Sequence, residues 1–149
     1  MYPETIVKIS LFFLLTVTLA SCTREKKIYI SGCNDGHEFK RISIANLADS
    51  LSFYNNKYVE VSGKYQQDKA LSILVGDNAT SIVAVEFSNE CPLYLTGTRT
   101  GFFDYDNNNG QLTPANNKIV ILRGEVICHK TANVNSYKAS ISHISYVQL

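Results

Sequence analysis

The sequence predicts an all-β fold: a small five-stranded barrel with a short helix before its first strand. From residue 58 onward, β-branched and aromatic residues alternate with polar ones, in short runs separated by Gly, Asn and Asp. No long helical periodicity competes with this pattern. In addition, the pattern at 55–65 (NNKYVEVSGKY) returns at 116–126 (NNKIVILRGEV), so two of the expected strands begin alike.

The first three strands are expected at 58–65, 70–75 and 81–88. Alternation along each run assigns one set of side chains to the inside of the barrel: Val59, Val61, Leu71, Ile73, Val75, Val83, Val85 and Phe87. The outward face of the second and third strands should then carry Ser72, Leu74, Ile82, Ala84 and Glu86.

The last two strands are expected at 119–128 and 137–149. Where the pattern repeats, an Asn pair suits a turn, and a glycine in mid-strand (Gly63 or Gly124) permits the bend or bulge that closing a small barrel requires. Ile119 and Ile121 should point outward, so they need a cover.

A short amphipathic helix is expected before the first strand. Ile44, Leu47, Leu51 and Tyr54 recur at helical spacing, and Ser43 can cap the start. Since no cations flank the apolar stripe, we expect it to close the barrel or cover its side rather than to bind a membrane.

The start of the chain has the pattern of a bacterial lipoprotein signal. An apolar run at 9–20, too short and too interrupted to span a bilayer, precedes Leu19-Ala20-Ser21-Cys22. We therefore expect a signal peptide at 1–21, lipid on Cys22, a tether and extension at 22–40, and one domain at 41–149. An ordinary secretory peptide or an uncleaved anchor helix is the alternative. Thr23 after the cysteine resembles lipoproteins of the outer membrane, facing either the periplasm or the surface.

Composition argues against nucleic acid as a partner. The formal net charge is only +1, whereas nucleic-acid binding requires neutralisation of several phosphates. The chain has 4 cysteines. With Cys22 used for lipid, Cys33, Cys91 and Cys128 remain in an oxidising compartment and permit one disulfide and one free thiol.

The strand pattern resembles the OB-fold, a Greek-key barrel with five strands and here its longest insertion, 89–117, between the third and fourth. Residues 54–63 (YNNKYVEVSG) resemble the Y-x-G-K-x-V-x-V-x-G signature of small OB-fold lipoproteins of the bacterial envelope, with Asn56 and Asn117 in place of Gly. In this topology Cys91 and Cys128 lie at opposite ends of the barrel. Because bridged cysteines need Cα atoms within about 7 Å, the resemblance makes Cys33 the common partner of either Cys91 or Cys128. We favour Cys91, because the helix before the first strand can carry its own start to that end of the barrel.

OB-folds bind ligands on the second and third strands and in the loops around them. The expected outward face lacks the aromatic and basic residues that single-stranded nucleic acid needs. The candidate ligand contacts are instead Phe102, Phe103 and Tyr105 in the insertion, if they are exposed, and Asn133 and Asn135 between the last two strands. Folding of these aromatics back onto the barrel is the favoured alternative.

Catalytic and metal-binding patterns are weak. Residues 104–115 begin like a calcium loop, but the glycine is one residue late and Ala115 stands where a bidentate Glu is required. The spacings of Cys33 with His37 and of Cys128 with His129 do not match zinc sites. We expect no cofactor, no metal and no catalytic residues.

These observations predict a lipid-anchored, non-catalytic binding or assembly module of the bacterial cell envelope, with a protein or a glycan as partner. The alternatives are a small metal-dependent or hydrolytic envelope enzyme, whose site would combine the insertion with His37, His129 and His143, and an accessory lipoprotein dedicated to the product of a neighbouring gene.

Overall fold

The protein is described by a computed structural model that covers residues 26–33, 36–68, 71–96, 112–129 and 137–149. The predicted all-β barrel is confirmed. Its strands are β3 (Tyr58–Asp68), β4 (Leu71–Val75), β5 (Ile82–Val85), β7 (Ile119–Cys128) and β8 (Ala139–Gln148). Around the barrel β3 pairs with β4, β4 with β5, β5 with β8, β8 with β7, and β7 with β3. Only the β5–β8 pair in this ring is parallel, as in an OB-fold.

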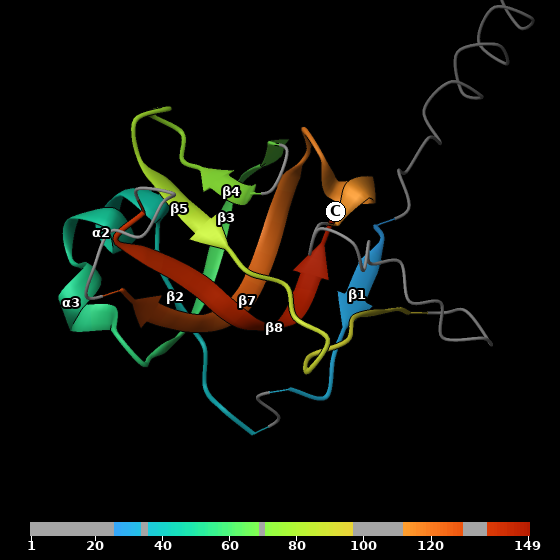
Figure 1. Ribbon diagram of the computed structural model, residues 1–149. Coiled ribbons are helices and arrows are strands. Elements are labelled where there is room, and N and C mark those ends of the chain that lie inside the picture. The colour runs from blue at the N-terminus through green and yellow to red at the C-terminus, as the bar shows by residue number, and fades with distance from the viewer. Residues whose placement is uncertain (1–25, 34–35, 69–70, 97–111, 130–136) are drawn as a thin grey trace, which may run out of the picture.

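Three short strands extend the barrel sheet (Figure 1). β1 (Ile28–Ile30) pairs with β8 and with β6 (Tyr94–Leu95), while β2 (Lys40–Arg41) runs parallel to β3. The sequence analysis missed all three, because two or three residues are too few to show a period. Leu149 N donates to Lys27 O at 2.9 Å, so much of the expected extension at 22–40 lies on the barrel.

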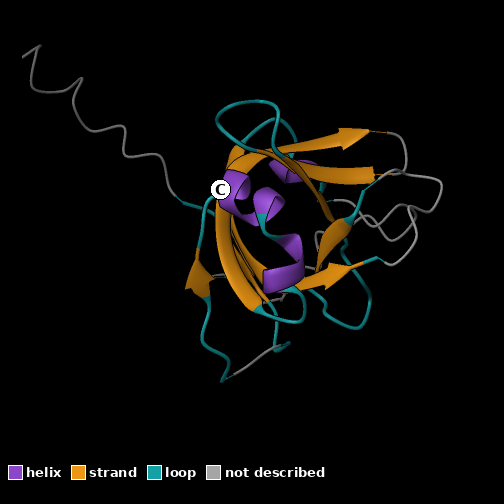
Figure 2. Ribbon diagram, turned by 90° about the vertical axis from the view of Figure 1, so that its left-hand side faces the viewer, coloured by secondary structure: helices purple, strands orange, loops and turns teal. Residues whose placement is uncertain are grey.

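The predicted helix is present in two pieces, α2 (Ile44–Asp49) and α3 (Leu51–Tyr54), which meet at Ser50. The Ser43 hydroxyl accepts a hydrogen bond from Asn46 N at 3.1 Å, as expected of an N-cap. Ile44 and Leu47 are buried, and α2 contacts β3 and β5. Figure 2 shows both helices across one end of the barrel, so the apolar stripe does close the barrel.

The two Asn-Asn-Lys segments form matching turns. Asn55 and Asn116 have almost the same backbone angles (φ −54°, ψ 132° and φ −55°, ψ 132°), and each is followed by an Asn at positive φ. In both turns the lysine N–H donates to the carbonyl three residues earlier, at 3.0 Å. These are type II turns, which require a positive φ at the third residue. The substitution of Asn for Gly in the signature is thereby explained.

Both turns are also fastened to the barrel in the same way. Asn55 Oδ1 accepts from Cys128 N at 2.8 Å, and Asn116 Oδ1 accepts from Gln67 N at 3.0 Å. The second turn follows the 3₁₀ helix η1 (Thr113–Ala115), which, with β6, gives the expected insertion some regular structure. Each side-chain oxygen thus satisfies a backbone N–H at the end of a neighbouring strand.

The direction of the side chains was predicted correctly in β3 and β5 but not in β4. Val59, Val61, Val83 and Val85 are buried as expected. In β4, however, Ser72 and Leu74 are buried and Leu71, Ile73 and Val75 are only half-buried. Apolar residues occupy both parities of this strand, and a shift of one residue reverses every side chain.

The two mid-strand glycines allow close approach. A Cβ on Gly63 would overlap Ile44 Cδ1 and lie 2.8 Å from Val75 O; one on Gly124 would lie 2.7 Å from Ser142 O. The pairing of β7 with β8 shifts register between Arg123 and Glu125, so the predicted irregularity occurs at Gly124.

Within the described part of the chain, no helix has both the length and the apolar character needed to cross a bilayer.

Candidate functional site

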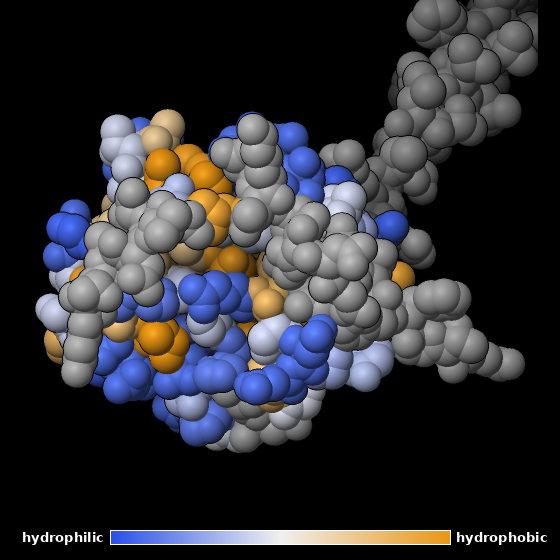
Figure 3. Space-filling model, in the orientation of Figure 1, coloured by the Kyte–Doolittle hydropathy of each residue, from blue (hydrophilic) through white to orange (hydrophobic). Residues whose placement is uncertain are grey.

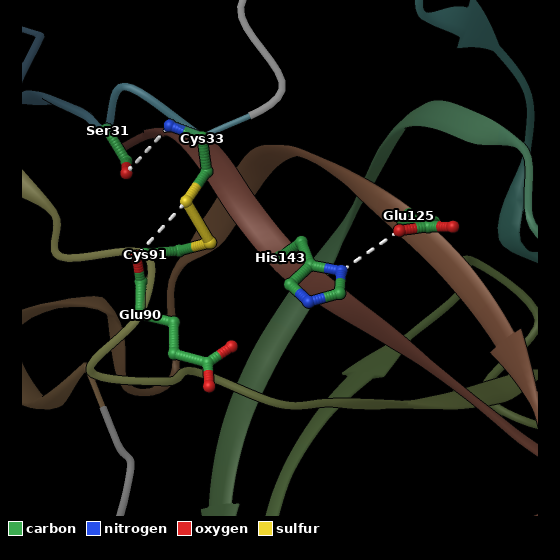
Figure 4. The surroundings of a disulfide bond; sticks show 6 residues. All are labelled: Ser31, Cys33, Glu90, Cys91, Glu125 and His143. Atoms are coloured by element: carbon green, nitrogen blue, oxygen red, sulfur yellow. Dashed lines mark hydrogen bonds and ion pairs between the residues drawn. A yellow bond between two sulfur atoms is a disulfide. The ribbon is translucent and has the colours of Figure 1, made fainter.

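The predicted disulfide between Cys33 and Cys91 is present, with the two Cα atoms 5.4 Å apart (Figure 4). The reason differs from the one expected. Pairing of β1 with β8 and β6, rather than the helix, brings Cys33 close to Cys91. The other predicted site residues, Cys22, Phe102, Phe103, Tyr105, Asn133 and Asn135, lie outside the described residues, as does most of the weak calcium-like segment.

Cys128 is the one free cysteine of the described residues. It is half-buried at the end of β7, and its thiol donates to Leu51 O in α3 at 3.3 Å. This position places Cys128 under the helix that closes the barrel. Because Cys33 is in the disulfide, the pair of Cys33 with His37 has no free thiol for zinc. Of the two Cys–His pairs considered, only Cys128 with His129 keeps its thiol.

A groove of about 730 Å³ lies between β2 and α2 on one side and β3 and β7 on the other. Apolar atoms of Ile42 and Ile121 line it together with the polar side chains of Lys40, Arg41, Ser43, Asn46, Ser62 and Asp77. This volume is typical of sites for small ligands or peptide side chains. The lining offers hydrogen-bond donors and acceptors on an apolar base.

Glu60 forms the charged wall of this groove. Its carboxylate is almost fully buried and accepts hydrogen bonds from Arg41 Nε at 2.6 Å and from Arg123 Nε at 2.8 Å. Burial by itself raises the pKa of Glu60, but the hydrogen bonds and charges of Arg123 and Arg41 outweigh that effect and leave the pKa below its ordinary value. Glu60 therefore stays ionised and links β2 to β3 and β7.

The segment before β2 covers the outward face next to Glu60. The His37 ring stacks on Tyr58 with centroids 4.0 Å apart, and Phe39 meets the same ring edge-on at 5.9 Å. The Arg123 guanidinium lies over Tyr146 at 4.6 Å from the ring centroid. A second groove, about 310 Å³ in volume, lies beside this cluster and is lined in part by His37, Phe39, Arg123 and Tyr146. The segment has no periodic pattern that could have predicted this cover.

The outward face of β4 and β5 differs from the one expected, since Leu71, Ile73 and Val75 replace Ser72 and Leu74 on it. Ile82 and Glu86 are exposed as predicted, whereas Ala84 between them is buried. Figure 3, in the orientation of Figure 1, shows apolar side chains over this part of the barrel and a broad hydrophilic region below them. The corrected face is more apolar, and β4 and β5 still contribute neither an aromatic ring nor a basic side chain to it.

One cluster on the barrel surface contains the residue types of a hydrolase. His129 Nε2 lies 3.0 Å from Ser140 Oγ and 3.5 Å from Glu86 Oε1, and the Ser142 hydroxyl donates to Glu86 Oε2 at 2.9 Å. A catalytic triad needs the acid on the ring nitrogen that does not face the nucleophile. Here Glu86 and Ser140 face the same nitrogen, and Ser140 is fully buried. The cluster therefore joins β5 to β8 without the geometry of an activated serine.

His143, one of the residues of the enzyme alternative, lies in β8. It has a positive φ of 48°, at the irregularity opposite Gly124, and its Nδ1 is 2.9 Å from Glu125 Oε2. Among the described residues, no group of three or more His, Cys, Asp or Glu side chains is placed to hold a metal ion.

Comparison with known proteins yielded no match: no family model, no curated protein and no solved structure corresponds to this chain.

Proposed function

We propose that the protein is a lipid-anchored, non-catalytic binding or assembly module of the bacterial cell envelope, related to the small OB-fold lipoproteins that residues 54–63 resemble. Its partner is an envelope protein or an envelope glycan. The lipoprotein pattern at Leu19 to Cys22 supports the anchor and the envelope location. The barrel supports the kinship in fold only, since one fold serves many functions.

The observation that carries the binding role is the composition of the groove beside β2. It is large enough for a peptide segment or a sugar unit, and it combines Lys40, Arg41 and Asp77 with neutral donors and acceptors around Ile121. Lys40 and Asp77 have opposite charges, so the lining favours a polar ligand of little net charge over a polyanion. No step of proton transfer is needed for such a role.

The enzyme alternative rests on the cluster of Glu86, His129 and Ser140. The buried serine and the shared ring nitrogen argue against nucleophilic catalysis there. A fluorophosphonate probe tests this directly. We expect no covalent adduct on the full chain, and an adduct that disappears in Ser140→Ala would favour the hydrolase.

The anchor is tested by Cys22→Ser in a bacterium that processes lipoproteins. The unaltered chain should gain the mass of its acyl groups, lose residues 1–21 and sediment with membranes. The Cys22→Ser chain should do none of these. Equal membrane association of both chains would contradict the proposal.

The groove is tested by filling it. Ser62 is exposed in the groove, so Ser62→Trp should block a ligand there, whereas Ser52→Trp places the same side chain on the exposed surface of α3 outside it. Binding to purified peptidoglycan fragments and recovery of crosslinked envelope proteins would be compared for the two variants. We expect loss of the bound partner only with Ser62→Trp. Equal binding by both would place the contact elsewhere.

The ligand contacts predicted in the insertion and in the loop between the last two strands are tested by two further variants. Replacing Phe102, Phe103 and Tyr105 by Ser, and Asn133 and Asn135 by Ala, should each weaken the same partner if the loops take part. If the loop variants retain the partner and Ser62→Trp loses it, the groove alone is the binding surface.

A further inference from the structure

The point at which the chain joins the barrel decides which part of the barrel can reach a membrane. Pairing begins at Lys27, whose carbonyl accepts from Leu149 N, and β1 follows at Ile28. Only residues 23–27 separate Ile28 from Cys22. At about 3.3–3.6 Å per residue, this segment spans less than about 22 Å even when fully extended. A lipid on Cys22 would therefore hold one end of the barrel next to the bilayer.

The pairing registers identify that end. Ile28 is opposite Gln148 in β8, Gln148 is opposite Ile121 in β7, and Ile119 lies two residues further in the same direction. Ile119 is in turn opposite Lys64 in β3. Figure 1 shows the start of β1, the C-terminus and the 3₁₀ helix η1 at this end, and α2 and α3 at the other.

The side chains at this end suit a lipid surface. Ile119 is 65% exposed, the largest exposed fraction among the large hydrophobic residues described. Four exposed lysines accompany it: Lys118 precedes Ile119, Lys64 is paired with it, and Lys26 and Lys27 precede β1, which lies on the other side of β8. None of the side chains described at 26–28, 64–66, 113–119 and 148–149 is acidic. Lysines next to a membrane are attracted to anionic headgroups, and their aliphatic stems accompany apolar neighbours into the interface.

We infer that the barrel end formed by Lys64, Lys118 and Ile119, together with Lys26 and Lys27, docks on the anionic lipid headgroups of the membrane in which Cys22 is anchored. This inference rests on the lipid anchor of the proposed function. Docking would hold the barrel in one orientation on the bilayer, instead of leaving it free to rotate at the end of its lipid anchor. The groove beside β2 borders this surface, because Ser62 and Ile121 in its lining are paired with each other and lie two residues from Lys64 and Ile119 on the same strands.

The absence of tryptophan from the chain allows a direct test. Ile119→Trp and Lys64→Trp each place a single fluorophore on the inferred surface, at exposed positions that tolerate a larger side chain. The matched control is Phe53→Trp in α3, which is 57% exposed at the opposite end. Each acylated full-length chain would be reconstituted into vesicles of phosphatidylethanolamine and phosphatidylglycerol, with or without brominated acyl chains.

We expect brominated lipid to quench the fluorescence of the Ile119→Trp and Lys64→Trp chains at least threefold more than that of the Phe53→Trp chain. Adding Lys26→Glu and Lys118→Glu to Ile119→Trp should remove most of that difference, as should vesicles of phosphatidylcholine alone. Equal quenching at the two ends, or stronger quenching of the Phe53→Trp chain, would overturn the inference. Anchored protein with no quenching in any variant would also overturn it, and would point to a protein partner on this end.

Mass spectrometry of the same samples separates the two proposals. An unacylated Cys22 would refute the anchor and, with it, the docking. An acylated chain that floats with the vesicles but shows no preference between the two ends would refute the docking alone. Circular dichroism of each variant confirms that the barrel is intact before the fluorescence is compared.

Discussion

The two Asn-Asn-Lys turns have nearly the same backbone angles and different surroundings. Tyr58 and Ile119 follow the lysine in the two turns, so they occupy equivalent positions at the start of β3 and β7. Tyr58 is covered by His37 and Phe39, whereas Ile119 is 65% exposed. The expectation that Ile119 and Ile121 would both be covered was wrong for Ile119, because α2 and α3 close the other end of the barrel.

This difference indicates that equal backbone geometry does not imply an equal role. The chain supplies its own cover at one turn, through the segment between Cys33 and β2. At the other turn the described residues supply none, and the exposed side chain follows Lys118 and lies opposite Lys64. The covered turn belongs to the folded core, and the bare turn is the better candidate for contact with something outside the chain. Four sets of substitutions test this contrast.

The largest effect is expected when the cover is released. The Cys33–Cys91 disulfide closes a separation of 58 residues, so Cys33→Ala with Cys91→Ala should lower the free energy of unfolding by about 4 kcal/mol. Urea unfolding measures this, with Cys128→Ala as the control for loss of a thiol. Loss of the stacking of His37 on Tyr58 should accompany it, visible as a change in near-ultraviolet circular dichroism. A double variant as stable as the control would show that the cover holds without the bond.

Truncating the two equivalent residues compares the turns directly. Tyr58→Ser should cost about 2 kcal/mol, because a packed aromatic ring is lost, and Ile119→Ser in the soluble chain should cost less than about 0.5 kcal/mol, as for exposed positions generally. Thermal or urea unfolding of both variants gives the two values. Similar losses would mean that Ile119 is buried in solution and that the contrast does not exist.

The ion cluster that holds the cover should respond to pH. The pKa of Glu60 is lowered in the folded state, so the stabilisation is present above the ordinary pKa of 4.5 and is lost as the pH falls through the lowered value. Glu60→Gln should cost about 1.5 kcal/mol near pH 7, the low end for hydrogen bonds to charged groups, because Arg41 is 79% exposed. The cost should shrink towards pH 3. A cost that is independent of pH would mean that the carboxylate charge contributes nothing.

The last comparison concerns the two turns themselves, where the costs of equivalent substitutions should be equal. Asn56→Ala and Asn117→Ala should each cost about 1 kcal/mol, because both residues have a positive φ (57° and 61°) that Ala adopts less readily. The corresponding Gly variants serve as controls and should be close to neutral. Unequal costs for the two Ala variants would show that the surroundings, and not the turn geometry, set the conformational strain.

Much of the fold could be predicted from sequence because its elements repeat a period or a motif. The five barrel strands, the cap at Ser43 and both Asn turns were predicted in this way, whereas the disulfide was predicted from the topology that the resemblance implies. The direction of β4 was wrong because Leu71, Ile73, Leu74 and Val75 are compatible with either face. β1, β2 and β6 were missed because they are too short to show alternation, and the burial of Glu60 was missed because Arg41 and Arg123 are distant from it in sequence.

The candidate site was less predictable for the same reason. The groove combines β2, α2, β3 and β7 with Asp77 in the turn after β4, and each contributes only one or a few residues. These elements are distant in sequence, so no local sequence pattern predicts that they form one groove. The residues that attracted attention by composition, Phe102, Phe103 and Tyr105, lie outside the described residues, and their role stays a prediction.

The pairing of β8 has a consequence for how the chain reaches its native state. This last strand is the neighbour of β1, β5 and β7, so it contacts the first strand of the chain as well as two strands in the middle. Neither the ring nor the β1 edge can form until the C-terminal residues are present. Contacts of such long sequence separation make folding slow, on the order of milliseconds to seconds, and they postpone burial of the core to the end of synthesis or export. If the chain is exported as proposed above, its barrel cannot close until β8 has crossed the membrane, so the chain stays without a closed core during passage, as a translocation channel requires.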